Sequence, residues 1–145
     1  MTTDLVFVDT NVFVYRLDAA DAQKQARARA WLEQLWSERS GRVSYQVLVE
    51  LYTTLTRKLA KPLAVAEARE AVQALSAWSP VVVDDKVLDG AWAIEARYGL
   101  SWWDALVVAA ARVAGCRFLL TEDLQHGQEL AGVEVVDPFL TEPSA

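Results

Sequence analysis

Short runs of consecutive apolar residues alternate along this chain with longer segments in which apolar residues recur every three or four positions. Fully apolar runs lie at residues 5–8 and 81–83, and mainly apolar runs lie at 117–121, which includes Arg117 and Thr121, and at 133–136, which includes Glu134. Short runs without polar alternation are typical of strands that are buried on both faces of a sheet. Residues 41–44 could form a further short strand.

Five segments have the apolar spacing of helices, and several are followed by residues that commonly end a helix. We expect helices over residues 22–39, 46–60, 64–77, 84/85–98 and 102–114. Pro62 follows the second of these, and Gly99 and Gly115 follow the last two. Ser101 can cap the helix that begins at residue 102.

Strands and helices alternate throughout the chain, and no strand–turn–strand signal is visible. This order predicts an α/β fold with a mostly parallel sheet of four or five strands and helices on both faces. No repeat or linker divides residues 1–145, so we expect a single domain. We expect residues 1–3 and 141–145 to be frayed.

The composition excludes several classes of protein. About half of the 145 residues are apolar, which predicts a sizeable core. The sequence has no apolar run of membrane-spanning length and no secretion leader, so the cytoplasm is the expected compartment. The single cysteine, Cys116, excludes an internal disulfide and a cysteine-based zinc site. The net charge of −6 argues against binding nucleic acid through overall charge, but it does not exclude a bound metal that reverses the sign of a site.

Acidic residues stand where the predicted strands end. In "LVFVDTNVFVY", residues 5–15, Asp9 directly follows a buried strand, although burial of an unpaired carboxylate costs free energy or raises its pKa. Asp123 follows the strand at 117–121. The carboxyl ends of parallel strands share one edge of a sheet, where sites commonly form. We therefore expect these two acids to lie close together.

Two further acids could join them, although each of the four has a simpler structural explanation. Asp104 lies in the first turn of a predicted helix, where its role could simply be to stabilise the helix through a favourable interaction with the helix dipole. Glu50 lies in a strongly apolar helical segment, where it could simply belong to the solvated face between Gln46 and Thr54. Asp123 could be a turn residue, and Asp9 could form an Asx-turn.

A cluster of these acids would need a counter-charge. Two carboxylates about 4 Å apart repel by roughly 4 kcal/mol at an effective dielectric constant of 20. Oxygen ligands alone favour Mg²⁺ or Mn²⁺, and the single histidine, His126, cannot build a zinc site. A magnesium ion held by acids and water is common equipment for phosphoryl chemistry.

Four motifs in order resemble those of PIN-domain ribonucleases, and within them the VapC-type toxins of toxin–antitoxin pairs. The motifs are "FVDTNVFVY", "SYQVLVELYTTLTRK", "YGLSWWDALVVAAARVAGC" and "LLTEDLQHG" followed by "VVDPF". The resemblance covers residues 4–139. It implies a three-layer α/β/α fold whose sheet has the strand order 3-2-1-4-5.

The resemblance also implies roles for individual residues. It assigns Mg²⁺ or Mn²⁺ to the acids Asp9, Glu50, Asp104 and Asp123, with Asn11 and Thr121 hydrogen-bonded near them. It implies an endoribonuclease that cleaves RNA with metal-activated water and leaves a 5′-phosphate and a 3′-hydroxyl. The implied partners are an RNA substrate, a cognate antitoxin and a second copy of the chain. We interpret Glu122 as a solvated neighbour and His126 as a surface or rim residue.

Other features have two interpretations each. The basic residues Arg16, Lys24, Arg27, Arg29, Arg57, Lys58 and Lys61 could guide RNA, or could be solvated with ion pairs. Trp102 and Trp103 could stack on bases, or at least one could pack in the core. The apolar residues Trp31, Leu32, Leu35, Trp36, Tyr52 and Leu55 could form a groove for an antitoxin helix, or ordinary core.

Three other classes of protein are alternatives. Two of them have acids after a strand of a parallel sheet, and the third would not use the acids for chemistry. A haloacid-dehalogenase-like phosphatase would need a second acid at position 11, where this chain has Asn11. A response-regulator receiver would need adjacent acids after its first strand, whereas Asp84 and Asp85 follow residues 81–83. A non-enzymatic α/β interaction module remains an alternative if the acids do not converge.

Overall fold

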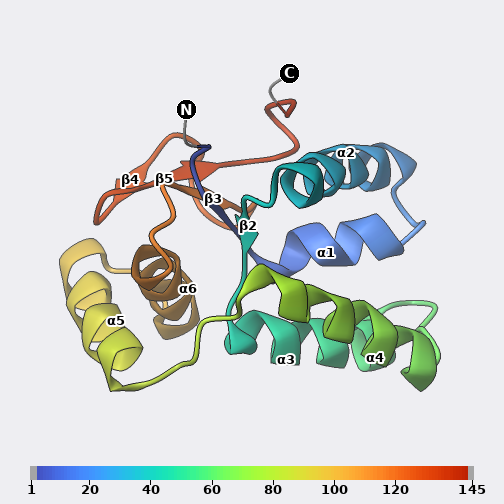
Figure 1. Cartoon of the computed structure of the whole chain (residues 1–145), viewed down its shortest axis with the longest axis horizontal. Coiled ribbons are helices and arrows are strands. Elements are labelled where there is room, and N and C mark those ends of the chain that lie inside the picture. The colour runs from blue at the N-terminus through green and yellow to red at the C-terminus, as the bar shows by residue number, and fades with distance from the viewer. Residues whose placement is uncertain (1–2, 144–145) are drawn as a thin grey trace.

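A five-stranded sheet lies at the centre of the protein, which is described here by a computed structural model of residues 3–143 (Figure 1). The strands are β1 (Val6–Val8), β2 (Gly41–Arg42), β3 (Phe118–Leu120), β4 (Glu129–Leu130) and β5 (Val133–Val136), in the spatial order β2-β1-β3-β5-β4. All neighbours are parallel except β4 and β5. The mostly parallel sheet predicted from the sequence is therefore confirmed.

Six α-helices cover the two faces of this sheet. They are α1 (Thr10–Leu17), α2 (Ala22–Glu38), α3 (Tyr45–Thr53), α4 (Val65–Ala74), α5 (Asp85–Tyr98) and α6 (Trp102–Val113). The helices α1 to α4 gather on one side, and α5 packs beside α6 on the other (Figure 1). This is the three-layer α/β/α arrangement, and none of these described helices combines the length and hydropathy needed to cross a lipid bilayer.

The strand register brings the carboxyl ends of the central strands to one level. Val8 of β1 pairs with Leu120 of β3, and Leu120 pairs with Val136 of β5. The residues that follow β1 and β3 therefore emerge side by side at one edge of the sheet. The fold thereby places Asp9 next to Thr121.

Helix α1 was not predicted, because the apolar and β-branched residues of its sequence, "TNVFVYRL", have high strand propensity. The helix begins directly after β1 because Asp9 caps it: one carboxylate oxygen of Asp9 accepts a hydrogen bond from the backbone N–H of Thr10. Val12 and Phe13 are buried, so packing against the core outweighs the local strand propensity.

The absence of a hairpin signal was a wrong prediction. Strands β4 and β5 form an antiparallel hairpin joined by the two residues Ala131 and Gly132. Both have positive φ, 51° and 88°, as a two-residue hairpin turn of this hand requires. Ala131 is an unusual residue for this position, so the sequence lacked the usual Asn-Gly signal, and the backbone N–H of Ala131 donates to the Tyr98 hydroxyl of α5.

Residues 81–83 do not form the predicted strand. Only Val81 joins the sheet, through a single parallel bridge to Ser44 beside β2, and the Val82 side chain is exposed. If Val81 is counted as a short strand beside β2, the sheet runs Val81-β2-β1-β3-β5-β4. The first five of these correspond to the order 3-2-1-4-5 that the family resemblance implies, and β4 is an additional strand at the edge. β2 is likewise shorter than the expected 41–44.

Two predicted helices change their winding before they end. The helix predicted over 46–60 is α-helical to Thr53 and then continues as a π-helical turn, Thr54–Lys58. The helix predicted over 64–77 ends as α4 at Ala74 and continues as a 3₁₀ turn, Leu75–Trp78. The other three helices have bounds within one residue of those predicted.

The chain ends are only partly covered by the described residues. Met1, Thr2, Ser144 and Ala145 lie outside them, so the expected fraying is not described there. The expectation is wrong for Thr141, because its carbonyl accepts a hydrogen bond of 2.9 Å from the indole nitrogen of Trp31.

Trp78 joins the helical layer to the edge of the sheet. Its indole is 5% exposed and lies 5.6 Å from the ring of Phe13 and 5.8 Å from that of Trp36. Gly41 of β2 lies against the same indole, and a Cβ added to Gly41 would lie 2.5 Å from two of the ring carbons. The absence of a side chain at Gly41 therefore allows Trp78 to pack on β2.

Gly41→Ala should lower the free energy of unfolding by about 1–3 kcal/mol, because the new methyl group must displace a buried indole. Gly90→Ala on α5 is the matched control: its Cβ would lie 3.6 Å from the Cβ of Ala109, which is ordinary contact. The control should raise stability by about 0.5–1 kcal/mol. Denaturant midpoints measure both changes, and equal midpoints for the parent and Gly41→Ala would contradict the packing described.

Candidate functional site

One groove at the carboxyl edge of the sheet receives all four candidate acids. Asp9 follows β1, Glu50 lies on α3, Asp104 lies on α6 and Asp123 follows β3, and all of them line a groove of about 770 Å³. The first and last of these acids, Asp9 and Asp123, are 114 positions apart in the chain and nevertheless line the same groove. The structure brings together the acids that the sequence singled out.

Asp9 is the most buried of the four, with 6% of its surface exposed. Its first carboxylate oxygen accepts from the Thr10 backbone N–H at 2.8 Å. Its second oxygen accepts from the Thr121 hydroxyl at 2.9 Å and, at a longer 3.5 Å, from the Asn11 amide. These donors fix the carboxylate between β1, α1 and β3.

Asn11 joins Asp9 to Asp123. Its amide nitrogen lies 3.0 Å from the Thr121 hydroxyl oxygen and 3.1 Å from a carboxylate oxygen of Asp123. The backbone N–H of Asp123 in turn donates to the Thr121 hydroxyl oxygen at 3.1 Å. Asn11 and Thr121 thus hydrogen-bond to the acids, as the resemblance implied.

Glu50 is oriented by two side chains that the sequence analysis did not single out. The Thr10 hydroxyl donates to one of its carboxylate oxygens at 2.9 Å, and the Gln46 amide donates to the other at 2.9 Å. Gln46 lies one helical turn before Glu50 on α3, and this i, i+4 spacing was a signal in the sequence. Thr10 had no comparable signal, because its contact with Glu50 spans 40 positions.

Asp104 occupies the first turn of α6, as predicted from the capping residue before it. The hydroxyl oxygen of Ser101 accepts a hydrogen bond of 3.1 Å from the Asp104 backbone N–H. The helix dipole favours an acid here, but the same position also places Asp104 in the groove. The structural explanation and the functional one are therefore compatible.

Burial and mutual repulsion raise the pKa of two of these acids. Burial raises the pKa of Asp9 to about 7, although its hydrogen bonds oppose the shift, and the charges of Asp123 and Glu50 add to it. Burial and the charge of Asp104 also raise the pKa of Asp123, against the hydrogen bond from Asn11. Negative charge in this groove is therefore under-compensated by the protein itself.

The donor set fits a hard divalent cation. All four acids offer oxygen, and the buried amide oxygens of Asn11 and Gln46 accept no hydrogen bond from any described residue. Within residues 3–143, however, no three of these acids stand close enough together to form a ready-made metal cluster. A cation would have to draw the carboxylates toward one another and offset the repulsion between them.

Glu122 is not the solvated neighbour that we expected. Its carboxylate forms an ion pair of 2.8 Å with Lys24 of α2, and its side chain is 23% exposed. Lys24 also lies 4.7 Å from the centre of the Tyr15 ring and 5.0 Å from that of Phe139. The pair attaches the segment between Thr121 and Asp123 to α2, a contact over 98 positions that no local pattern indicates.

The other candidates are distributed over the surface. His126 is exposed, and its Nδ1 accepts from the backbone N–H of Asp137, so it lies outside the groove. Of the basic residues, Lys58 lines the groove, while Lys24 is paired with Glu122 and Arg27 lies 3.7 Å from Glu142. Trp102 stacks on Trp92 at 5.7 Å, whereas Trp103 is exposed and lines the groove.

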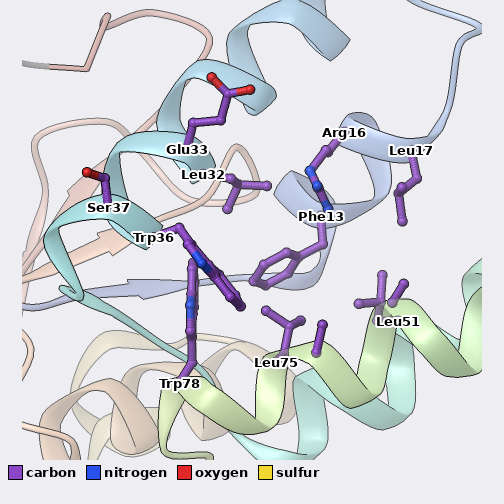
Figure 2. A pocket seen from close by; sticks show the side chains of 12 residues that line it. Phe13, Arg16, Leu17, Leu32, Glu33, Trp36, Ser37, Leu51, Leu75 and Trp78 are labelled. Carbon is purple, nitrogen blue, oxygen red and sulfur yellow. The ribbon is translucent and has the colours of Figure 1, made fainter.

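The apolar patch predicted on the two helices divides into core and surface. Leu32, Leu35 and Leu55 are buried, so the interpretation as ordinary core is correct for these three. Trp36 is 50% exposed and lines a second cavity of about 400 Å³. Residues of α1, α2, α3, α4 and the 3₁₀ turn Leu75–Trp78 line this cavity. Figure 2 shows Trp36, Trp78 and Phe13 pointing toward one another inside it.

Comparison with known proteins gives a family match over most of the chain. The model of the family described as PIN domain matches residues 6–128. No curated protein matches the sequence significantly.

Solved structures share the fold at low sequence identity. A toxin–antitoxin complex from Klebsiella pneumoniae is 18% identical, with a TM-score of 0.66 over 95% of this chain and 99% of that one. VapC20 of Mycobacterium tuberculosis, described as a toxin that cleaves the sarcin-ricin loop, is 24% identical, with a TM-score of 0.57 over 79% and 86%. VapBC2 of Rickettsia felis, bound to a promoter DNA fragment, is 14% identical, with a TM-score of 0.62 over 90% and 96%.

Asp9→Asn should change how stability depends on pH in EDTA. The folded pKa of Asp9, about 7, lies above its ordinary value of 3.8, so ionised Asp9 destabilises the fold. This cost is absent below about pH 4, grows as the pH rises toward 7, and reaches at most about 4 kcal/mol at roughly 1.4 kcal/mol per pKa unit. The variant should therefore become more stable relative to the parent as the pH rises from 4 to 8.

Chemical denaturation at several pH values measures this difference. Asp89→Asn on α5 is the control, because the exposed Asp89 meets water in both the folded and the unfolded chain. A constant difference between Asp9→Asn and the parent at every pH would contradict the destabilising burial of Asp9.

Proposed function

The chain belongs to the PIN domain family, and we propose that it is a Mg²⁺- or Mn²⁺-dependent endoribonuclease that acts as the toxin of a toxin–antitoxin pair. The observation that carries the proposal is the convergence of Asp9, Glu50, Asp104 and Asp123 from four elements in one groove. The likeness to solved toxins and toxin–antitoxin complexes supports the same conclusion. A cytoplasmic location accompanies this proposal.

The residues of the chain would hold and orient the reacting groups. The four acids would hold the cation, while Thr121, Asn11 and Thr10 keep three of them in place through the hydrogen bonds described. A bound divalent cation supplies an activated water and stabilises charge on the phosphate. It would also neutralise the groove, so that a polyanion can approach an acidic chain.

The reaction is hydrolysis of a phosphodiester bond. Water adds to phosphorus, the bond from phosphorus to the 3′ oxygen breaks, and that oxygen takes up a proton. The products are a 5′-phosphate and a 3′-hydroxyl. The groove contains neither the cysteine nor the histidine of the chain, so it offers no Ser–His or Cys–His nucleophile.

Membership of the PIN family disfavours the phosphatase alternative. The position that a haloacid-dehalogenase-like phosphatase would fill with a second acid is Asn11, whose amide binds Thr121 and Asp123. The convergence of the acids likewise disfavours a non-enzymatic module.

The parent protein should cleave RNA with Mg²⁺ or Mn²⁺ and lose this activity in excess EDTA. Asp9→Asn, which removes one buried acid of the groove, should lower the cleavage rate by roughly 10²-fold or more, since a lost ligand weakens metal binding and misplaces what remains. Gel analysis of end-labelled RNA measures the rate and identifies the 5′-phosphate.

Glu134→Gln removes one acid from the exposed side of β5 and should cleave like the parent. Cleavage in EDTA at the rate seen with Mg²⁺ would exclude the proposed mechanism. So would cyclic phosphate ends, because they arise from attack by the RNA 2′-hydroxyl and not by water.

The second cavity is the proposed seat of the antitoxin. Phe13 and Leu17 of α1, Leu32 and Trp36 of α2, and Leu75 and Trp78 line it, with Arg16 and Glu33 at the rim (Figure 2). An apolar groove between helices with charges at its rim suits an amphipathic helix. The solved neighbours that are toxin–antitoxin complexes support a protein partner, and the resemblance also implies a homodimer.

Trp36→Glu should weaken the complex with the antitoxin at least tenfold, because a charged group replaces a half-exposed apolar anchor in the groove. The antitoxin to test is the product of a short reading frame next to this gene that encodes a DNA-binding protein, and calorimetry of the purified pair measures the affinity. Trp92→Glu, at a tryptophan of similar exposure outside the groove, should bind like the parent. Equal affinity of parent and Trp36→Glu would remove the groove from the interface.

A further inference from the structure

Among the tryptophans of residues 3–143, Trp103 is the one whose indole neither pairs with another aromatic ring nor donates a hydrogen bond. Trp36 pairs with Trp78, Trp92 stacks on Trp102, and the Trp31 indole donates to two backbone carbonyls. The Trp103 indole is 63% exposed, and no other aromatic ring of residues 3–143 stacks on it. What sets Trp103 apart from other exposed apolar residues is its position in the groove of the four acids.

Trp103 lines the groove of the four acids and directly precedes Asp104. Tyr45 and Val49, 51% and 66% exposed, line the same groove from α3. The groove therefore has an exposed apolar and aromatic side next to its carboxylates. Such a surface suits the face of a nucleobase, which is apolar and aromatic, as well as it suits a protein side chain.

The backbone that carries Trp103 is fixed. The Ser101 hydroxyl caps the turn at Asp104, and the Gln46 amide, which also binds Glu50, lies 3.4 Å from the Trp103 carbonyl oxygen. The indole is thus presented from the first turn of a helix that also carries an acid of the site. An aromatic side chain on a fixed backbone next to an acid of the site can help to position a nucleotide.

The same groove contains one cationic side chain among the described residues that line it, Lys58. Lys58 ends the π-helical turn that follows α3, and such turns are frequent at functional sites. Glu50, Thr54 and Lys58 follow one another at intervals of four residues, and all line the groove. The ammonium group of Lys58 complements a phosphate, which the acids alone would repel.

We propose that Trp103 stacks on an unpaired base next to the scissile phosphate of an RNA strand, while Lys58 binds a neighbouring phosphate. The proposal rests on the proposed nuclease function and deepens it by assigning two residues of this groove, Trp103 and Lys58, to positioning the strand. Bases in a duplex have both faces covered, so only a strand, loop or bulge can offer a free face to an indole. A second copy of this acidic chain would bring like charge to the four carboxylates of the groove, whereas RNA brings phosphates that can share the cation of the proposed function.

Binding of an oligoribonucleotide to protein carrying Asp9→Asn, which slows cleavage of the probe, tests both contacts when it is measured at a Mg²⁺ concentration that saturates this variant. Trp103→Ala should raise Kd for the single strand by about tenfold to a hundredfold, Trp103→Phe should restore most of the affinity, and Trp92→Ala is the control. The Kd for a duplex of the same sequence should not change with Trp103→Ala. Lys58→Met should reduce the slope of log K against log salt by about 0.7, and Lys58→Arg should not.

Sedimentation of the same variants examines the competing occupant. Unchanged RNA affinity in Trp103→Ala overturns the proposal, and dissociation of a dimer with unchanged affinity assigns this face to a contact between copies instead. The nuclease function is judged separately, by cleavage with the Asp9 parent. Cleavage that is normal in Trp103→Ala sinks this inference alone, whereas binding without any cleavage by the parent sinks the proposed function alone.

Discussion

The burial of the Asp9 carboxylate is the constraint on which the rest of the site depends. A carboxylate that is 6% exposed must find donors within the protein, and Asp9 finds them on two elements at once. The Thr10 N–H begins α1 directly after β1, and the Thr121 hydroxyl ties β1 to the end of β3. Burial raises the pKa of Asp9 by more than these hydrogen bonds lower it, and the net result is a raised pKa. The protein's own groups therefore do not fully compensate a negative charge at this position.

The triplet Asp9-Thr10-Asn11 distributes this constraint over the whole groove. Each of its three side chains contacts a different acid or its support: Asp9 binds Thr121, Thr10 binds Glu50, and Asn11 binds Asp123. Three consecutive residues at the start of one helix therefore set the positions of acids that come from α3 and from the end of β3. A change in the start of α1 would therefore disturb the contacts of Asp9, Glu50 and Asp123 together.

The sequence predicted what depends on local pattern and on the geometry of parallel sheets. The strands at β1, β3 and β5, the capped helix α6 and the meeting of Asp9 with Asp123 follow from short apolar runs and from the shared edge of parallel strands. It did not predict the Ala131-Gly132 hairpin, because Ala131 has positive φ without being Gly or Asn. Nor did it predict the pair Lys24–Glu122, which joins residues 98 positions apart through tertiary packing alone.

Helix α1 connects the two concave surfaces of the molecule. Its first residues contact the acids, while Phe13 and Leu17 further along line the apolar cavity with Trp36. Eight residues at about 1.5 Å each make a helix of roughly 12 Å, so the two surfaces are separated by little more than its length. A partner helix seated only in the cavity would nevertheless leave the acids open, because the two surfaces share no lining residue. A partner that silences the acids must therefore either extend past the cavity to the groove or shift α1, and a shift of α1 would pull the hydrogen bonds of Thr10 and Asn11 away from Glu50 and Asp123.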